Sequence, residues 1–146
     1  LDKIISNQPA YSMLNRDIEE TVLDTCGRLG ISQVVYSPLA QGVLTGKYAG
    51  GDVPEGSRAA DPEGEGRFMQ RYLNEENIAR SAELVEVAGS LGMTAAQLAL
   101  AWCLRQENVA SVICGAKKPE QIEDNVGASG REISDEALER IERILA

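Results

Sequence analysis

The sequence contains no histidine among its 146 residues. Histidine is the side chain whose charge changes near neutral pH, and it is the usual base beside a serine or cysteine nucleophile. Its absence excludes Ser-His-Asp and Cys-His catalysis, proton shuttling through imidazole and histidine-rich metal sites from whatever these residues do alone.

Cysteine is also scarce, with Cys26, Cys103 and Cys114 far apart and no CxxC pair. Without histidine, a zinc site would need an unusual set of cysteines and carboxylates. We therefore predict no metal site. Because free cysteine is among the most frequently buried residues, we expect three buried, reduced thiols in a cytoplasmic protein.

Basic residues are outnumbered, since 14 Lys and Arg stand against 23 Asp and Glu, and the net charge is −9. Nucleic acids and anionic membrane surfaces bind to basic faces, which such a chain lacks. Apolar runs fall far short of the ~20 residues of a membrane span, and no signal-peptide pattern opens the chain. We predict no nucleic-acid partner and no membrane span.

Three short segments have the composition of strands: residues 3–8, 31–37 and 109–115. The second and third are continuous apolar runs, typical of parallel strands that are buried on both faces. Helical patterns alternate with them, which predicts an α/β fold with a parallel sheet. Three parallel strands cannot close a barrel and leave two edges unpaired. Either further strands come from elsewhere, or the sheet is small and open.

The expected helices have start and stop signals that satisfy free backbone groups. These signals are Asn15 as an N-cap with Gly30 as the stop, residues 78–88 stopped by Gly92, a Thr94–Gln97 capping box, Pro119 at a first helical position, and Ser134 opening a terminal helix over residues 134–146.

A glycine- and proline-rich stretch covers residues 38–71. Long loops within compact domains are uncommon and are usually functional or mobile. For residues 59–68 the alternative is a disordered connector.

Residues 36–48, YSPLAQGVLTGKY, follow the carboxyl end of the second strand, where parallel α/β proteins bind ligands. The ring of Tyr36, the hydroxyl of Ser37, two glycines and Lys47 suit a cofactor that has an aromatic ring and phosphates. A packing tyrosine followed by a tight turn is the structural alternative.

Residues 115–125, GAKKPEQIEDN, follow the third strand and enter a helix whose N-terminus offers N–H donors and the positive end of its dipole. We expect Lys117, backbone N–H groups and Gln121 to hold a phosphomonoester. The alternative is a solvated helix start with incidental lysines.

Four motifs in this order resemble those of the aldo-keto reductases, in particular the branch with bacterial oxidoreductases and potassium-channel β subunits. They are Asn7-Gln8-Pro9-x-Tyr11-Ser12-x-Leu14-Asn15-Arg16, YSPLAQGVLTGKY, Pro54-x-Gly56-Ser57-Arg58 and GAKKPEQIEDNVGA. The resemblance spans residues 1–146. It implies the C-terminal half of a (β/α)8 TIM barrel, with parallel strands, peripheral helices, bound NADP(H) and a small-molecule carbonyl substrate.

The resemblance also implies a cofactor role for individual residues. Gln8 would bind the nicotinamide carboxamide, and Tyr36 would stack on the nicotinamide ring. The remaining contacts would be Ser37, Pro38, Leu39, Ala40, Gln41 and Lys47 along the pyrophosphate, Arg58 from the covering loop, Gly115, Lys117 and Gln121 around the 2′-phosphate, and Asp124 with Asn125 at the adenine amino edge.

Two of these positions depart from the family pattern. Lys117 stands where many relatives place serine, which would strengthen a preference for NADPH over NADH. Asp124 stands where relatives often have glutamate and is one methylene shorter, which weakens the expectation of a direct adenine contact.

The family's catalytic tyrosine, lysine, aspartate and histidine come from the N-terminal half of the barrel. We assign no catalytic residue to this chain, because Tyr11, Tyr48 and Tyr72 do not fall at the catalytic position. One hypothesis is therefore the cofactor-binding half of an oxidoreductase that reduces aldehydes or ketones to alcohols, completed by a missing N-terminal half. The other is a non-catalytic module: a truncated or regulatory NADPH-binding protein, or a half-barrel whose edges a second copy covers.

Overall fold

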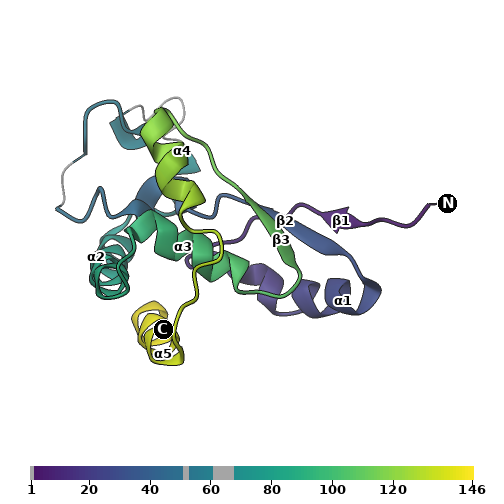
Figure 1. Ribbon diagram of the computed structural model, residues 1–146. Helices are drawn as coiled ribbons and strands as arrows, with labels where there is room; N and C mark the ends of the chain where they lie inside the picture. Colours follow the sequence, from purple (N-terminus) through teal and green to yellow (C-terminus); the bar gives the residue numbers. More distant parts are fainter. Residues whose placement is uncertain (1, 51–52, 61–67) are drawn as a thin grey trace.

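The computed structural model describes residues 2–50, 53–60 and 68–146. In this part of the chain, β1 (Ser6–Asn7), β2 (Ser32–Tyr36) and β3 (Val109–Ile113) form one parallel sheet in the order β1-β2-β3 (Figure 1). The sheet is not closed. Tyr36 is in register with Ile113 at the carboxyl ends of β2 and β3, so the loops that follow these strands begin side by side.

Helices lie between and after the strands, as an α/β fold requires, and the predicted fold class is confirmed. The helices are α1 (Val22–Leu29), α2 (Glu75–Ser90), α3 (Ala95–Leu104), α4 (Pro119–Val126) and α5 (Asp135–Leu145), with 3-10 turns η1 (Asp17–Glu19), η2 (Ala40–Thr45) and η3 (Arg58–Ala60). Helices α2, α3 and α5 lie together away from the N-terminus, and α4 follows β3 (Figure 1).

The first strand is shorter than the prediction of residues 3–8. Only Ser6 and Asn7 pair with β2, and Ala10 makes an isolated bridge to Tyr36. Ile4 and Ile5 are exposed. A β-branched run favours a strand, but a paired neighbour decides its length, and the described residues provide a neighbour for two positions.

The predicted N-cap at Asn15 is wrong. Asn15 and Ser12 exchange two main-chain hydrogen bonds of 3.0 Å, which close a tight turn before the 3-10 turn η1. Helix α1 begins at Val22 and ends at Gly30, whose φ of +67° places it in the left-handed region. The stop signal was therefore correctly placed, but the start was not, because the Ser12–Asn15 turn prevents Asn15 from capping a helix.

The capping box at the start of α3 is present. The Thr94 hydroxyl accepts a hydrogen bond from the Gln97 N–H at 3.1 Å, and the Thr94 N–H donates to Gln97 Oε1 at 3.2 Å. At the start of α5, Ser134 Oγ accepts from the Ala137 N–H.

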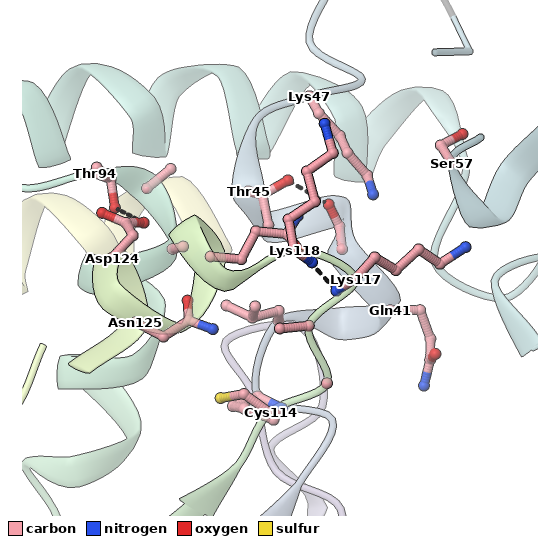
Figure 2. A pocket seen from close by; sticks show the side chains of 18 of the residues that line it. Gln41, Thr45, Lys47, Ser57, Thr94, Cys114, Lys117, Lys118, Asp124 and Asn125 are labelled. Atoms are coloured by element: carbon pink, nitrogen blue, oxygen red, sulfur yellow. Dashed lines mark hydrogen bonds between the residues drawn. The ribbon is translucent and has the colours of Figure 1, made fainter. Parts of the chain in front are cut away.

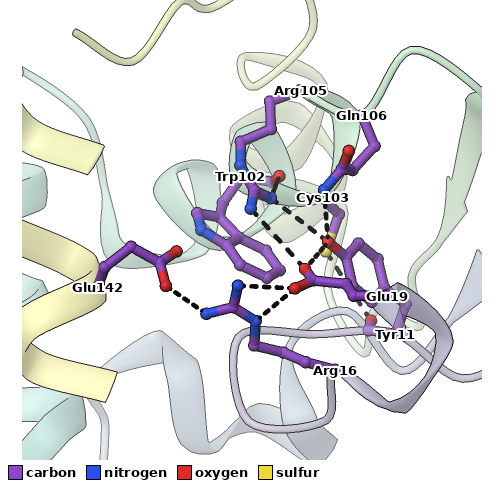
Figure 3. A network of polar contacts seen from close by, with 8 residues as sticks. All are labelled: Tyr11, Arg16, Glu19, Trp102, Cys103, Arg105, Gln106 and Glu142. Atoms are coloured by element: carbon purple, nitrogen blue, oxygen red, sulfur yellow. Dashed lines mark hydrogen bonds and ion pairs between the residues drawn. The ribbon is translucent and has the colours of Figure 1, made fainter. Parts of the chain in front are cut away.

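Trp102 of α3 is fully buried at the centre of a polar network (Figure 3). The guanidinium carbon of Arg105 lies 3.7 Å from its ring centroid, and that of Arg16 lies 5.2 Å away. Glu19 accepts hydrogen bonds from Arg16 and from the Tyr11 hydroxyl. The network therefore joins the segment after β1 to the core helix, and cation–π contacts add to the burial of the indole.

The expectation of three buried thiols is correct for one cysteine. Cys103 is fully buried in α3, whereas Cys26 and Cys114 are partly exposed, and all three are free. Cys114 comes immediately after β3, where the sheet edge is open, so the apolar neighbours that predicted its burial do not enclose it.

Between residues 38 and 71, the described parts (38–50, 53–60 and 68–71) have little regular structure apart from η2 and η3. The disordered-connector alternative falls mostly on residues 61–67, which lie outside the described residues. Within the described ranges, no single helix is long and apolar enough to cross a membrane, and α2 with α3 reaches that length only as a pair bent by 87°.

Candidate functional site

A cleft of about 890 Å³ lies at the carboxyl ends of β2 and β3 (Figure 2). Its walls are the loop after β2, residues 54–57, the first turn of α3, and the segment that leads from β3 into α4. Small-molecule and cofactor sites commonly measure about 300–1,000 Å³ and lie at this end of parallel sheets. The size and position of the cleft therefore fit a ligand site.

The loop after β2 has an unusual backbone. Ser37, Ala40 and Gln41 have φ values of +57°, +46° and +60°, and they are the non-glycine residues with positive φ in the described part of the chain. Residues with side chains adopt this region at a cost, and such residues cluster at ligand sites. The Gln41 side-chain amide donates to Ser37 Oγ at 2.9 Å and braces the turn.

Glycine is needed at position 42 of the same loop. Its φ is +98°, and a Cβ atom there would lie 2.9 Å from Lys47 Nζ. The Thr45 hydroxyl donates to the Gly42 carbonyl at 2.8 Å, and Lys47 Nζ lies 5.0 Å from the centroid of the Tyr48 ring. The loop therefore folds back so that Lys47 lies over Gly42 at the wall of the cleft.

The start of α4 is closed by its own side chain. Gln121 Oε1 accepts hydrogen bonds from the N–H groups of Lys117 and Lys118 at 2.8 and 3.3 Å. From the sequence we predicted that backbone donors of this kind hold a phosphate. In this structure, two of them already have Gln121 as a partner. The Lys117 ammonium donates to the Gly56 carbonyl at 3.4 Å and joins the start of α4 to the loop over residues 54–57.

Asp124 of α4 contacts the start of α3. Its Oδ2 accepts from the Thr94 hydroxyl at 2.9 Å, and its Oδ1 accepts from the Gln97 side-chain amide at 3.0 Å. Asn125 lies next to it on the wall of the cleft (Figure 2).

Ser57 belongs to one of the four sequence motifs but is not among the predicted cofactor residues. Its hydroxyl oxygen is buried, lines the cleft and has no hydrogen-bond partner among the residues that the structure describes. Buried polar atoms almost always have a partner, so this hydroxyl is a candidate for bonding a ligand. The Pro54-x-Gly56-Ser57-Arg58 motif was the signal for it.

Most of the predicted cofactor residues come together in this cleft. Those that line it are Tyr36, Ser37, Pro38, Leu39, Gln41, Lys47, Gly115, Lys117, Gln121, Asp124 and Asn125. Of the others, Gln8 is exposed next to β1, Ala40 is fully buried in the core, and Arg58 begins η3. The lining also includes Thr45, Ser57, Thr94, Cys114 and Lys118, which sequence reasoning did not assign.

The cleft is not uniformly basic. It is lined by Lys47, Lys117 and Lys118, and also by three carboxylates, those of Glu55, Glu120 and Asp124. The Asp124 carboxylate is hydrogen-bonded to α3, as described above. Burial raises the pKa of the Cys114 thiol, which keeps that side chain neutral near physiological pH.

Comparison with known proteins places the chain in a family. The sequence profile of the aldo/keto reductase family matches residues 1–146. The chain is 38% identical to the L-glyceraldehyde 3-phosphate reductase of Escherichia coli O157:H7, covering 98% of this chain and 42% of that protein. It is 41% identical to a probable voltage-gated potassium channel subunit beta of Oryza sativa subsp. japonica, covering 85% of this chain and 38% of that protein.

Solved structures agree with this assignment. The glycerol dehydrogenase of Gluconobacter oxydans superimposes with a TM-score of 0.78 at 27% identity, covering 97% of this chain and 42% of that one. A thermostable aldo-keto reductase superimposes with a TM-score of 0.66 at 23% identity, which bears on the fold alone. These neighbours are TIM barrels, so the three-stranded sheet corresponds to part of a barrel.

The chain spans about two fifths of the length of these relatives. It belongs to the aldo/keto reductase family.

Proposed function

We propose that these residues form the NADP(H)-binding half of an oxidoreductase that reduces aldehydes or ketones to alcohols. The observation that carries the proposal is the meeting of two loops, distant in sequence, in one cleft. Tyr36 stands at the end of β2 with 44% of its surface exposed, and the loop after β3 brings Lys117 to the same cleft. An exposed aromatic ring together with lysines suits a dinucleotide that has a nicotinamide ring and phosphates.

The cleft has groups that a dinucleotide phosphate would satisfy. The buried Ser57 hydroxyl lacks a partner among the described residues, and the missing side chain at Gly42 lets the Lys47 ammonium lie over the loop backbone. The Lys117 side chain extends from the start of α4 toward the side of the cleft that holds Gln41 and Ser57 (Figure 2). The residues present therefore fit the cofactor.

In this proposal each part of the cleft holds one part of the cofactor. Tyr36 stacks on the nicotinamide ring, and the loop from Ser37 to Lys47 follows the pyrophosphate. Lys117 pairs with the 2′-phosphate. We also assign Gln8 and Arg58 as cofactor contacts, because the family resemblance implies these roles. When bound, the nicotinamide supplies the hydride that reduces a carbonyl carbon.

The proton for the alcohol would come from outside this chain. We assign the catalytic tyrosine and lysine to residues that the relatives carry beyond the part matched here, since the chain covers 42% of the Escherichia coli reductase. That protein's name specifies an aldehyde phosphate, which supports a small carbonyl compound as the substrate class. A cytoplasmic location is part of the same proposal.

A second candidate is a non-catalytic NADPH-binding subunit. The observation that favours it is the 41% identity to the probable potassium channel subunit beta of rice. The two candidates differ in turnover: the enzyme consumes NADPH in the presence of simple aldehydes, whereas the regulatory module binds NADPH without consuming it.

The experiment compares NADPH and NADH binding to the intact protein that carries these 146 residues, before and after Lys117→Glu. Reversing the charge next to the 2′-phosphate should raise the dissociation constant for NADPH by about tenfold or more, because charge-assisted hydrogen bonds to phosphate are among the strongest. NADH, which lacks that phosphate, should bind as before. Lys3→Glu is the matched control, because it makes the same charge change outside the residues that line the cleft.

An equal loss of affinity for both cofactors in Lys117→Glu would remove Lys117 from the 2′-phosphate site. Tyr36→Ala tests the nicotinamide end separately. If NADPH affinity did not change in that variant, the stacking assignment would be wrong.

A further inference from the structure

Helix α4 carries Gln121 and Asn125 on the wall of the cleft, but apolar burial does not hold it there. None of its residues is buried, and its two large apolar side chains, Ile122 and Val126, are 57% and 67% exposed. A surface helix is normally stabilised by packing one apolar face on the core. Some other contact must therefore fix the position of α4.

That contact is a polar cluster between α3 and α4, which we call the capping clamp: Thr94, Gln97 and Asp124. The Thr94 hydroxyl accepts from the Gln97 N–H at 3.1 Å and donates to Asp124 Oδ2 at 2.9 Å. The Gln97 side chain accepts from the Thr94 N–H and donates to Asp124 twice, at 2.9 Å to its main-chain carbonyl and at 3.0 Å to Oδ1. The residues that cap α3 thus also bind α4.

The backbone of α4 is shaped to accept this clamp. A Cβ atom at Gly127 would lie 2.5 Å from the Gln97 side-chain nitrogen and 3.1 Å from the Asp124 carbonyl oxygen. The glycine at the end of α4 therefore leaves the space in which the Gln97 amide reaches Asp124.

Electrostatics favours the same arrangement. The Asp124 carboxylate lies at the N-terminus of α3, where the helix dipole and free N–H groups stabilise negative charge. Both of its oxygens accept hydrogen bonds from α3. These bonds direct the carboxylate to α3, and Asn125 is the neighbouring polar side chain on the cleft wall (Figure 2).

We propose that Thr94 and Gln97, acting through Asp124, are positioning residues that hold α4 so that Asn125 and Gln121 meet the adenosine end of the dinucleotide. Asp124 is then a member of the clamp and not a contact of the base. This inference rests on the proposed function, because it concerns the same cleft and cofactor.

The test separates the two ends of the cofactor in the intact protein. Dissociation constants are measured for adenosine 2′,5′-bisphosphate, for nicotinamide mononucleotide and for NADPH. Thr94→Val and Gln97→Met remove the hydroxyl and amide donors at nearly constant volume. Each should weaken adenosine 2′,5′-bisphosphate by about tenfold, the effect of one hydrogen bond to a charged group, and leave nicotinamide mononucleotide unchanged.

Two further variants distinguish positioning from a general loss of stability. Thr94→Ser keeps the hydroxyl and should restore the affinity for adenosine 2′,5′-bisphosphate. Ser134→Ala removes the comparable N-cap of α5, whose hydroxyl accepts from the Ala137 N–H outside the cleft lining, and should leave all three constants unchanged. Thermal unfolding of each variant shows whether the stability losses of the two N-cap variants are alike.

If the parent protein binds NADPH and both clamp variants bind every fragment like the parent, the clamp is overturned and the proposed function stands. The clamp is likewise overturned, and the proposed function stands, if the variants weaken both fragments equally. Failure of the parent to bind NADPH would overturn the proposed function and the clamp with it.

Discussion

Ser81 on α2 donates a hydrogen bond of 2.8 Å to the main-chain carbonyl of Val43 in η2, and both residues are buried. This bond joins the loop that walls the cleft to the helical core. The same carbonyl also accepts from the Gly46 N–H, at the longer distance of 3.3 Å. The shape of the loop at the carboxyl end of β2 therefore depends on a residue 38 positions later in the sequence.

We expect Ser81→Ala to lower the free energy of unfolding by about 1 kcal/mol, the typical net value of one hydrogen bond, since the Val43 carbonyl retains its weaker partner. Urea unfolding measures this. Ser90→Ala is the control: its hydroxyl donates to the Val87 carbonyl within the same helix, but the residue is exposed and water can replace it. Equal losses in the two variants would show that burial of the Ser81 bond is without consequence.

Gly46 should not tolerate a side chain. Its φ is +77°, and a Cβ atom there would lie 2.4 Å from Val85 Cγ2. The left-handed conformation alone costs an L-residue about 1–2 kcal/mol, and the contact adds to that, so we expect Gly46→Ala to lose about 2 kcal/mol or more.

Thermal unfolding of three variants separates these causes. Gly89→Ala, inside α2 with no described residue within 4 Å of its Cβ position, should gain about 0.5–1 kcal/mol because alanine favours a helix. Adding Val85→Ala to Gly46→Ala should recover the part of the loss that is due to contact. No recovery would show that backbone strain accounts for the whole effect.

Among the described residues, two carboxylates contact Arg16, and the first of them, Glu19, is better shielded from water than the second, Glu142. Glu19 has 22% of its side chain exposed and also accepts from the Tyr11 hydroxyl, whereas Glu142 is 46% exposed. We expect Glu19→Gln to destabilise the protein by about 1–3 kcal/mol, because two arginines and a tyrosine lose a charged partner (Figure 3).

Glu142→Gln should cost no more than about 0.5 kcal/mol, as is usual for an exposed ion pair. Chemical denaturation at low and high salt measures both variants. A larger loss in Glu142→Gln than in Glu19→Gln would contradict the conclusion that the better-shielded Glu19 contributes more to stability than Glu142.

Because of the Cys103 thiol, we expect the free energy of unfolding to fall as the pH becomes alkaline. Burial raises the pKa of its thiol from the ordinary value of 9.0 to about 12. Between these pH values the thiol of the unfolded chain releases its proton, whereas the thiol of the folded chain retains it. The contribution of Cys103 to the free energy of unfolding is therefore complete below pH 9 and is lost as the pH rises toward 12. The slope from this one group reaches about 1.4 kcal/mol per pH unit.

Urea unfolding at about pH 8 and about pH 10.5 gives the change with pH for each variant. Cys103→Ala should show a smaller change with pH than the parent, because it lacks this thiol. Cys26→Ala, at a partly exposed cysteine, should keep the parent's pH dependence. If Cys103→Ala kept the parent's pH dependence in full, its thiol would titrate in the folded protein as it does in the unfolded chain.

Sequence signals for helix starts and stops were correct where the hydrogen bonds behind them join residues close together in the sequence. The Thr94–Gln97 capping box, the stop at Gly30 and the terminal helix opened by Ser134 all involve residues within a few positions of one another. The same kind of signal was wrong at Asn15, because the Ser12–Asn15 turn uses the backbone groups that a helix start would need.

The sequence predicted those site residues that belong to the motifs in the loops after β2 and β3. The loops after β2 and β3 were both expected to bind the cofactor, and both line the cleft. Thr94 was predictable as a cap but not as a partner of Asp124, because that contact joins residues 30 positions apart through the packing of α3 and α4. The Pro54-x-Gly56-Ser57-Arg58 motif marks the segment that contains Ser57, but only the tertiary structure shows that this hydroxyl is buried without a partner among the described residues.

The sequence by itself determined the alternation of strands and helices, the caps at Thr94 and Ser134, and the glycines of the cleft loops, since these depend on backbone conformation and short-range hydrogen bonds. The tertiary structure alone decided the length of β1, the burial of Cys103 but not of Cys114, and the direction of the Asp124 carboxylate. Each of these depends on which distant segment lies next to the residue, and that is a property of the packed chain, not of local sequence.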